Sequence, residues 1–262
     1  MDIILNIITP IGSLDGLDQT INSVKKVSSK IKSLKFNHIL VLNNSVEYSI
    51  LDSVNQSTNL ITNIININPI ASRSKARNAA LRQINIITGV SSFVIFLDAG
   101  DKLLDKAIKN ITNLETKLES NNRLFVNQSY IELNNKAKLS KIPLFPISFR
   151  KIVNPFLLGG IILSSELAKK IEFYEGKKED WVYWNSILDL QPEIHKTNNF
   201  NYIYKIDNTT KHYKNKYHSI KELRKILVNH LKWSGILSYL VFILHFILIT
   251  IRWLYINLKN KI

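Results

Sequence analysis

Short apolar runs that alternate with amphipathic segments constrain this chain more than any other feature. The runs at 3–9, 38–42, 60–67 and 93–97 are rich in β-branched or aromatic side chains, and polar, Pro or Gly residues close each of them. The segment 72–85 places its apolar residues at helical spacing. Continuous apolar strands alternating with such helices predict an α/β fold, with helices covering both faces of a mostly parallel sheet.

The second half of the chain has a less regular pattern. Its expected elements, in order, are a helix over 104–118, a strand over 123–133, a loop over 143–155, a strand over 156–163 and a helix over 180–190. With 262 residues and 45% apolar composition, the chain is long enough for one domain and an extension. We therefore expect a globular domain over 1–205.

Basic residues dominate the C-terminal part of the chain. The net charge is +15, and residues 205–262 contain eleven Lys or Arg against two acids. This basic stretch runs into the most apolar segment, and its aromatic residues are not interleaved with the basic ones. The pattern favours an anionic membrane surface over nucleic acid as the partner. The absence of cysteine excludes disulfides and thiol catalysis and favours the cytosol, and no secretory signal is evident.

The C-terminal extension divides into a basic amphipathic linker over 206–232, a hydrophobic membrane helix over 233–256 and a short basic tail over 257–262. Its residues 233–251 contain no Asp, Glu, Lys or Arg. As a helix they would extend about 28 Å, just short of the ~30 Å hydrocarbon core. A single span, an interfacial or re-entrant segment and a soluble core helix all remain open. The excess of Lys and Arg before this run predicts that the domain lies on the cytoplasmic face of the cell membrane.

Polar residues follow the predicted strands at the positions where parallel sheets bind ligands, the carboxyl ends of the strands. They are Thr9-Pro10, Asn43 and the pair Asp98 and Asp101. Two carboxylates three residues apart after a buried strand can converge on Mg²⁺ or Mn²⁺. Alternatively, both acids belong to the start of the next helix, where negative charge is favourable.

Three further charged residues lie at helix starts. The guanidinium of Arg77 could pair bidentately with a diphosphate, or it could simply be solvated on the surface. Glu179 and Asp180 begin a helix, where the helix dipole alone would favour them.

Taken together, these residues resemble a family 2 inverting glycosyltransferase of the GT-A fold. The motifs that carry the resemblance occur in the family order over residues 3–190: Ile7-Ile8-Thr9-Pro10, Leu42-Asn43-Asn44-Ser45, Ala76-Arg77-Asn78, Phe96-Leu97-Asp98-Ala99-Gly100-Asp101 and Glu179-Asp180-Trp181. Each motif is weak alone, but five in order at the expected strand and helix ends are specific.

The resemblance implies a reaction and a set of roles. A nucleotide-diphosphate sugar, a UDP-sugar in the first instance, would be the donor, and the acceptor would be a membrane-held lipid-linked saccharide or polysaccharide. A divalent cation would be the cofactor. Asp180 would be the catalytic base, with Glu179 orienting it or the acceptor. The implied binding residues are Thr9, Pro10, Asn43, Arg77 and Asp98 for the donor, and Asp98 and Asp101 for the metal. Trp181 and Trp184 are implied for the acceptor, although core packing explains these two tryptophans equally well.

Two departures from the family pattern affect these roles. Asn43 replaces the acid that usually faces the donor nucleoside, and Gly100 replaces the middle acid of the metal motif. If that middle acid were indispensable, the chain would be a catalytically silent GT-A-like scaffold protein at the membrane, which is the alternative function.

Overall fold

The computed structural model describes residues 3–43, 59–67, 72–106, 108, 122–133, 139–141, 145–206, 228, 240–251 and 254. The strands are β1 (Ile3–Ile11), β2 (Lys35–Asn43), β3 (Leu60–Ile67), β4 (Ser91–Phe96), β5 (Lys102–Leu103), β6 (Arg123–Leu133), β7 (Leu139–Lys141), β8 (Ile161–Ser164) and β9 (Glu193–Ile206). The labelled helices are α1 (Leu17–Lys30), α2 (Arg73–Gln83), α4 (Ser165–Lys169) and α5 (Glu179–Asp189), with 3-10 turns η2 (Ile147–Phe149) and η3 (Leu158–Gly160).

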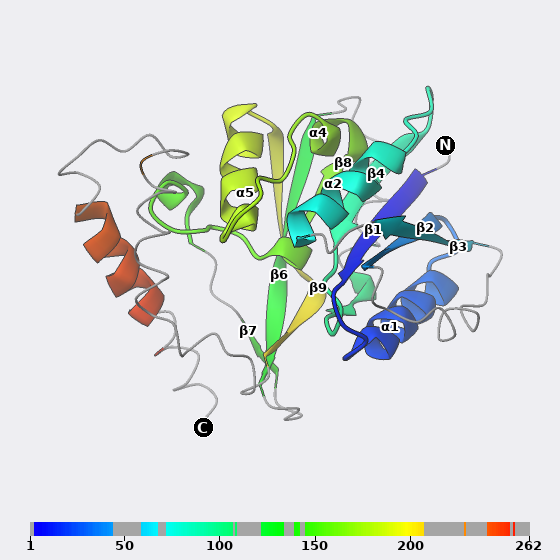
Figure 1. Ribbon diagram of the computed structural model, residues 1–262, viewed down its shortest axis with the longest axis horizontal. Coiled ribbons are helices and arrows are strands. Elements are labelled where there is room, and N and C mark those ends of the chain that lie inside the picture. Colours follow the sequence, from blue (N-terminus) through cyan, green and yellow to red (C-terminus); the bar gives the residue numbers. More distant parts are fainter. Residues whose placement is uncertain are drawn as a thin grey trace.

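These strands form one mixed sheet in the order β3-β2-β1-β4-β8-β6-β9-β5, with β7 paired to β6. The first four strands of this order are parallel, as the sequence pattern predicts. Strand β8 runs antiparallel to both of its neighbours, and β5 and β7 also pair antiparallel. The α/β class is confirmed, but parallel pairing is confined to these four strands and to the pair β6 and β9, so the sheet is not mostly parallel (Figure 1).

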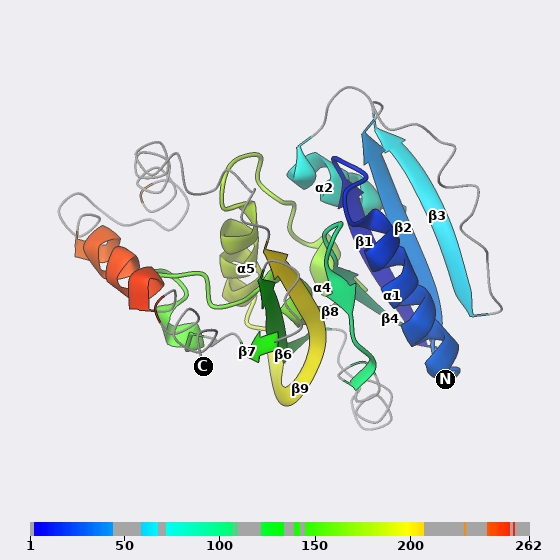
Figure 2. The ribbon, with the colours of Figure 1, turned by 90° about the horizontal axis from the view of Figure 1, so that it is seen from below.

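The period of two along the strands divides the core between the two faces of the sheet. Side chains such as Leu5 and Ile95 pack with those of α1, whereas Ile8 and Phe96 pack with those of α2, α4 and α5. Figures 1 and 2 show α1 on one side of the sheet and the other three helices on the opposite side. Successive residues of a strand point to opposite faces, so continuous apolar runs are what a sheet covered on both faces requires.

Strands β1, β2 and β4 end at the same edge of the sheet. The sequence predicts that β1 ends before Pro10, but the strand runs through this residue to Ile11. The strand tolerates the proline because β4 ends before it reaches the position beside Pro10. The last residue of β4, Phe96, pairs with Ile8. Alternate residues of a parallel strand bond to the same neighbour, so the missing N–H of Pro10 faces no partner strand.

Two parts of the second half differ from the expectation. The predicted strand 156–163 is a 3-10 turn followed by β8, and the two glycines of this turn pack closely against neighbouring strands. A Cβ on Gly159 would lie 2.6 Å from the ring of Tyr202. The strand β9 was not expected from the sequence. The predicted helix 104–118 and the turn residues after Asn43 lie mostly outside the described residues.

A further helix spans residues 240–251 and lies beside α5 and the segment before β8 (Figure 1). Within the described ranges, none of the helices has the length and apolarity needed to cross a membrane. The predicted membrane helix 233–256 is described only in this middle part, and the linker 206–232 and the tail 257–262 lie almost wholly outside the described residues.

Candidate active site

Arg77 is the centre of a buried charge network at the carboxyl edge of the sheet. Its Nη2 donates to Oδ1 of Asp98 at 2.7 Å, and its Nη1 donates to Oε1 of Glu179 at 2.9 Å. The side chain is 1% exposed, and its guanidinium lies 5.2 Å from the centre of the Phe173 ring. Although burial opposes its charge, Asp98 and Glu179 hold the pKa of Arg77 above its ordinary value.

Local structure fixes α2, which carries this arginine. The hydroxyl of Ser72 accepts a hydrogen bond from the backbone N–H of Lys75 and caps the helix. Asn78 exchanges two hydrogen bonds with the backbone of Phe173, at 2.9 and 2.7 Å. Because α2 is held at its start and at its inner face, the guanidinium of Arg77 has a defined position. The alternative of a solvated surface arginine is wrong, since the side chain is 1% exposed. Direct binding of a diphosphate by Arg77 stays a prediction.

Asp180 lies next to this network in the first turn of α5. Its Oδ2 accepts a hydrogen bond from Nδ2 of Asn154 at 2.7 Å. The Oδ1 of Asn154 in turn accepts from the backbone N–H of Phe156, which holds the amide in place. Burial, and then the adjacent Glu179 carboxylate, raise the pKa of Asp180. A carboxylate with a raised pKa is a stronger base, which is what deprotonation of a hydroxyl requires.

The two acids of the loop after β4, Asp98 and Asp101, point in different directions. The carboxylate of Asp98 faces Arg77 and Arg73, the latter 3.6 Å from its Oδ2. The chain then turns at Gly100, whose φ of 98° is one that residues with a Cβ rarely adopt. The Gly100 N–H donates to the hydroxyl of Thr20 on α1, and that hydroxyl donates to the carbonyl of Asp101. Gly100 is therefore required by the turn.

Asp101 is buried among residues of β9 on the α1 side. Its Oδ1 accepts the backbone N–H of Lys205 at 3.0 Å, and the hydroxyl of Tyr202 also hydrogen-bonds to it. Burial, together with repulsion from Asp98, raises the pKa of Asp101 well above its ordinary value. These contacts tie the loop to β9.

The predicted metal site fits this geometry in part. No cluster of three His, Cys, Asp or Glu side chains suited to a metal occurs in the described part of the chain. Asp98, partly exposed at the sheet edge, suits a divalent cation that takes its other ligands from phosphate and water. Asp101 is bonded to residues of β9, and coordination of the cation by both acids stays a prediction.

The remaining predicted donor residues lie at the same edge. Thr9 is buried, and its hydroxyl lies 3.0 Å from Nε2 of His38. Burial lowers the pKa of His38 to about 3, so this ring is neutral. Pro10 is also buried, and Asn43 is the last residue of β2. Thr9 and Pro10 therefore lie beneath the edge of the sheet, and donor binding by Thr9, Pro10 and Asn43 stays a prediction.

Trp181 and Trp184 are fully buried. The indole N–H of Trp181 donates to the carbonyl of Arg150 at 2.6 Å, and Trp184 packs edge-on against Phe96 and Phe156. Neither ring presents a face to an acceptor sugar. The structure thus supports core packing, the interpretation that the sequence left open.

Two functional candidates were missed by the sequence reasoning. Arg73 is exposed at the start of α2 and faces Asp98. Its position one helical turn before Arg77 was a usable signal, since residues i and i+4 share a helix face. Asn154 lies in the expected loop 143–155, and only the fold brings it to Asp180.

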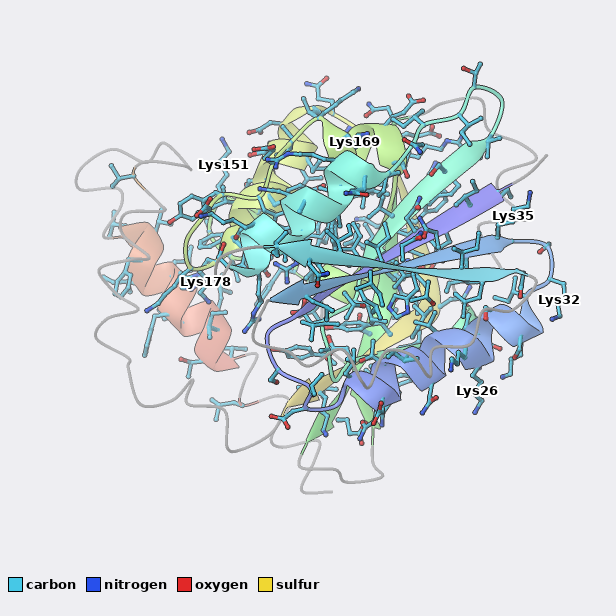
Figure 3. The ribbon with its side chains drawn as sticks, turned by 45° about the vertical axis from the view of Figure 1, so that its right-hand side comes forward. Lys26, Lys32, Lys35, Lys151, Lys169 and Lys178 are labelled. Atoms are coloured by element: carbon cyan, nitrogen blue, oxygen red, sulfur yellow. The ribbon has the colours of Figure 1, made fainter. Side chains whose placement is uncertain are left out.

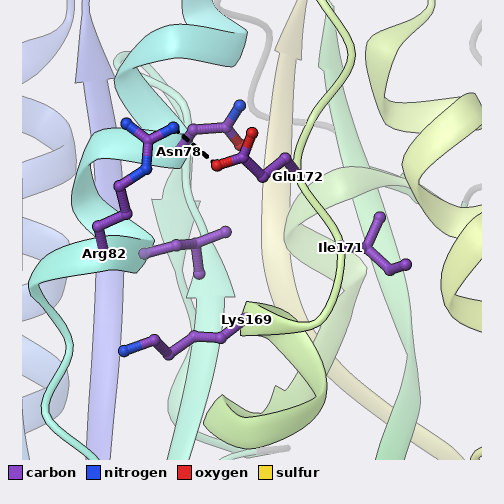
Figure 4. Close-up of a pocket in the computed structure, with 6 residues that line it drawn as sticks. Asn78, Arg82, Lys169, Ile171 and Glu172 are labelled. Atoms are coloured by element: carbon purple, nitrogen blue, oxygen red, sulfur yellow. Dashed lines mark hydrogen bonds and ion pairs between the residues drawn. The ribbon is translucent and has the colours of Figure 1, made fainter.

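A small hollow at the C-terminal half of α2 is not the site. It has a volume of about 40 Å³ and lies between α2 and the segment after α4, where Arg82 pairs with Glu172 at 2.7 Å (Figure 4). Pockets for small ligands usually measure about 300–1,000 Å³. This hollow is therefore too small for a nucleotide sugar.

The fold is shared with glycosyltransferases of known structure. Residues 1–349 of S. aureus TarS in complex with UDP-GlcNAc match with a TM-score of 0.62 and 15% identity, covering 92% of this chain and 69% of that chain. The UDP complex of the same protein gives 0.60 and 15%, with 92% and 68% coverage. The mannosyltransferase PcManGT from Pyrobaculum calidifontis, in complex with GDP-Man and Mn²⁺, gives 0.58 and 11%, with 88% and 65% coverage.

No protein-family model matches the sequence, and no curated protein does. The chain therefore has a GT-A-like glycosyltransferase fold, which the structural neighbours establish without assigning it to a family.

Proposed function

We propose that this protein transfers a sugar from a nucleotide-diphosphate donor, with inversion, to a membrane-held acceptor. The observation that carries the proposal is the pairing of Arg77 with both Asp98 and Glu179 at the carboxyl edge of the sheet. This network joins the loop after β4 to the start of α5, and it holds Asp180 beside them. In the proposal Asp98 serves the donor, and Glu179 and Asp180 serve the acceptor, as the resemblance to family 2 implies.

In the proposed reaction, the acceptor hydroxyl oxygen bonds to the anomeric carbon while the bond from that carbon to the diphosphate breaks. Asp180 takes the hydroxyl proton, and Asn154 orients its carboxylate. Arg77 fixes Asp98 and Glu179, and the exposed Arg73 is the cation that we assign to the diphosphate. A divalent cation held by Asp98 would neutralise charge on the leaving diphosphate.

The donor class rests on similar folds that hold UDP, UDP-GlcNAc and GDP-Man. We take a UDP-sugar as the first donor to test and a GDP-sugar as the second. For the acceptor, we propose a lipid-linked saccharide or a surface polysaccharide. We place the enzyme at the cytoplasmic face of the cell membrane because of its basic and apolar C-terminal sequence.

The direct test is nucleotide binding. UDP or GDP should raise the stability of the full-length protein, by about 2.7 kcal/mol at a concentration about 100-fold above its Kd. The shift should be larger with Mn²⁺, and Asp98→Asn should remove the increment due to the metal. Asp189→Asn is the matched control, because Asp189 also pairs with an arginine at 2.7 Å but lies at the far end of α5.

A protein that binds neither nucleotide, with or without the metal, would contradict the proposal. That result would favour the silent scaffold, which the glycine at position 100 of the metal motif makes the second candidate.

A further inference from the structure

The helix 240–251 has an unusual surface for a water-exposed element. Large apolar side chains that are 38–59% exposed occupy most of its outer face: Leu240, Ile243, Leu244, Phe246, Ile247, Ile249 and Ile251. Its two polar side chains both bond to carbonyl groups. The hydroxyl of Thr250 donates to the carbonyl of Phe246, and Nδ1 of His245 donates to that of Ile152. Such a helix suits contact with lipid.

The opposite face of this helix is docked on the domain. Val241 is buried in a cluster with Trp181 and Val182. The imidazole of His245 stacks on the indole of Trp181, with ring centres 5.3 Å apart and planes at 15°. A helix docked in this way along the domain cannot also be surrounded by lipid across a bilayer. Its position therefore favours the interfacial alternative over a span.

The positive charge beside the helix favours a membrane with anionic headgroups. Lys178 precedes α5 on the side of the helix (Figure 3), near enough to His245 to help lower its pKa. Lys177 is exposed beside it. The sequence between residues 205 and 232, which leads to the helix, adds eight Lys or Arg. Cations at the edge of an apolar face favour anionic headgroups.

We propose that the helix 240–251 lies in the plane of an anionic membrane leaflet, with its apolar outer face in the lipid. The inference rests on the proposed function for the role of the helix, which is to bring Asp180 to a membrane-held acceptor. The docked face of the helix contacts two residues that lie close in sequence to Asp180 or to its partner Asn154. Trp181 is the next residue in α5, and Ile152 lies two residues before Asn154, which bonds to Asp180.

The test measures flotation of the full-length protein with vesicles of phosphatidylcholine, with and without phosphatidylglycerol. The double variant Phe246→Asp/Ile247→Asp should lower the partition coefficient at least about tenfold, because two apolar contacts are replaced by charges. The matched control is Ile86→Asp/Ile87→Asp, which changes two adjacent exposed isoleucines far from the helix and adds the same charge. It should stay within about twofold of wild type.

Two results of the flotation test would overturn this proposal. One is equal vesicle binding by the helix variant and the control. The other is a wild-type protein that dimerises without lipid through this face and does not bind vesicles. Binding of UDP or GDP, measured on the same variants, should be unchanged. If the proposed function is wrong, the protein will not bind UDP or GDP, but its flotation with vesicles will not be affected.

The orientation of the helix can be measured separately because the chain contains no cysteine. Single-cysteine variants Leu240→Cys and Ile251→Cys place an environment-sensitive fluorophore at two exposed positions, about 16 Å apart along the helix axis. An in-plane helix gives the two probes the same depth, as measured with lipids brominated at different acyl positions. Depths that differ by most of that spacing would show a spanning helix and would overturn the proposal.

Discussion

Arg77 and Glu179 are 102 residues apart in the sequence, yet Nη1 of the arginine lies 2.9 Å from Oε1 of the glutamate. The same guanidinium holds Asp98 on its other side, so one buried cation joins the loop after β4 to the start of α5. A buried charge with two partners is structurally demanding, because removal of one partner leaves the others uncompensated. The pairing therefore gives Arg77 a positioning role, whereas direct binding of a diphosphate by Arg77 stays a prediction.

The two arginines of α2 should separate stability from donor binding. Arg77→Ala should lower the free energy of unfolding by about 3–5 kcal/mol, because Asp98 and Glu179 lose a buried partner. Arg73→Ala should change stability by no more than about 0.5 kcal/mol, because this side chain is 64% exposed, but it should weaken nucleoside diphosphate binding. Urea unfolding and calorimetric titration measure the two effects. Equal loss of nucleotide binding at unchanged stability in both variants would instead support direct binding of the donor by Arg77.

Asp180→Asn should lower single-turnover transfer by about 10² to 10⁴, because the amide cannot accept a proton at neutral pH. Stability and donor affinity should be retained. In wild type the rate should rise with pH through the raised pKa of Asp180, since only the ionised carboxylate acts as a base. Near-normal turnover in the variant would leave Asp180 as a residue of the first helical turn with no catalytic role.

Asn154→Ala provides a second readout for the same site. Loss of a hydrogen bond to the ionised carboxylate should move the acidic limb of the rate profile to higher pH. An unchanged limb with a uniformly lower rate would mean that Asn154 acts only through local structure.

The sequence predicted the parallel half of the sheet well, because β1, β2 and β4 are largely buried on both faces and read as continuous apolar runs. The edge strand β3 is more exposed, but it is also rich in isoleucine. The sequence also placed Asp98 at the carboxyl edge of the sheet and Arg77, Glu179 and Asp180 at helix starts, but it did not predict the pairing that brings them together. It did not predict β9, whose polar residues Asn199 and Asn201 interrupt the apolar pattern. The turn at Gly100, which directs Asp101 away from Asp98, depends on contacts with α1 and is not visible in the local sequence.

Gly100 provides a test of that turn. Gly100→Ala should cost about 1–3 kcal/mol of unfolding free energy, because its φ of 98° is strained for any residue with a Cβ. Gly12→Ala is the control, since Gly12 has no positive φ and a Cβ there meets nothing within 4 Å. Thermal or urea unfolding compares the two. Equal stability of both variants would show that the loop can adopt another conformation, in which an acid at position 100 would be tolerated.

Asp101→Asn should change how stability depends on pH. The pKa of Asp101 is raised in the folded state, so this group stabilises the fold at low pH and loses that contribution as pH rises from its ordinary value near 3.8. The wild-type curve should therefore fall relative to that of the variant by up to about 1.4 kcal/mol per pH unit above that value. Urea unfolding of both proteins at several pH values measures the difference. Parallel curves would mean that Asp101 titrates normally.

The network around Arg77 also has a consequence for linkage. The cations of Arg73, Arg77 and Lys178 act on the carboxylates of Asp98, Glu179 and Asp180, so these six charges balance before any anion arrives. A diphosphate adds negative charge to this balance, and its binding should draw in a cation or a proton. Asp180, whose pKa is already raised, is placed to take that proton. Donor affinity should then increase as pH falls, while the capacity of Asp180 to accept a proton from the acceptor decreases, so binding and turnover would have opposite pH dependences.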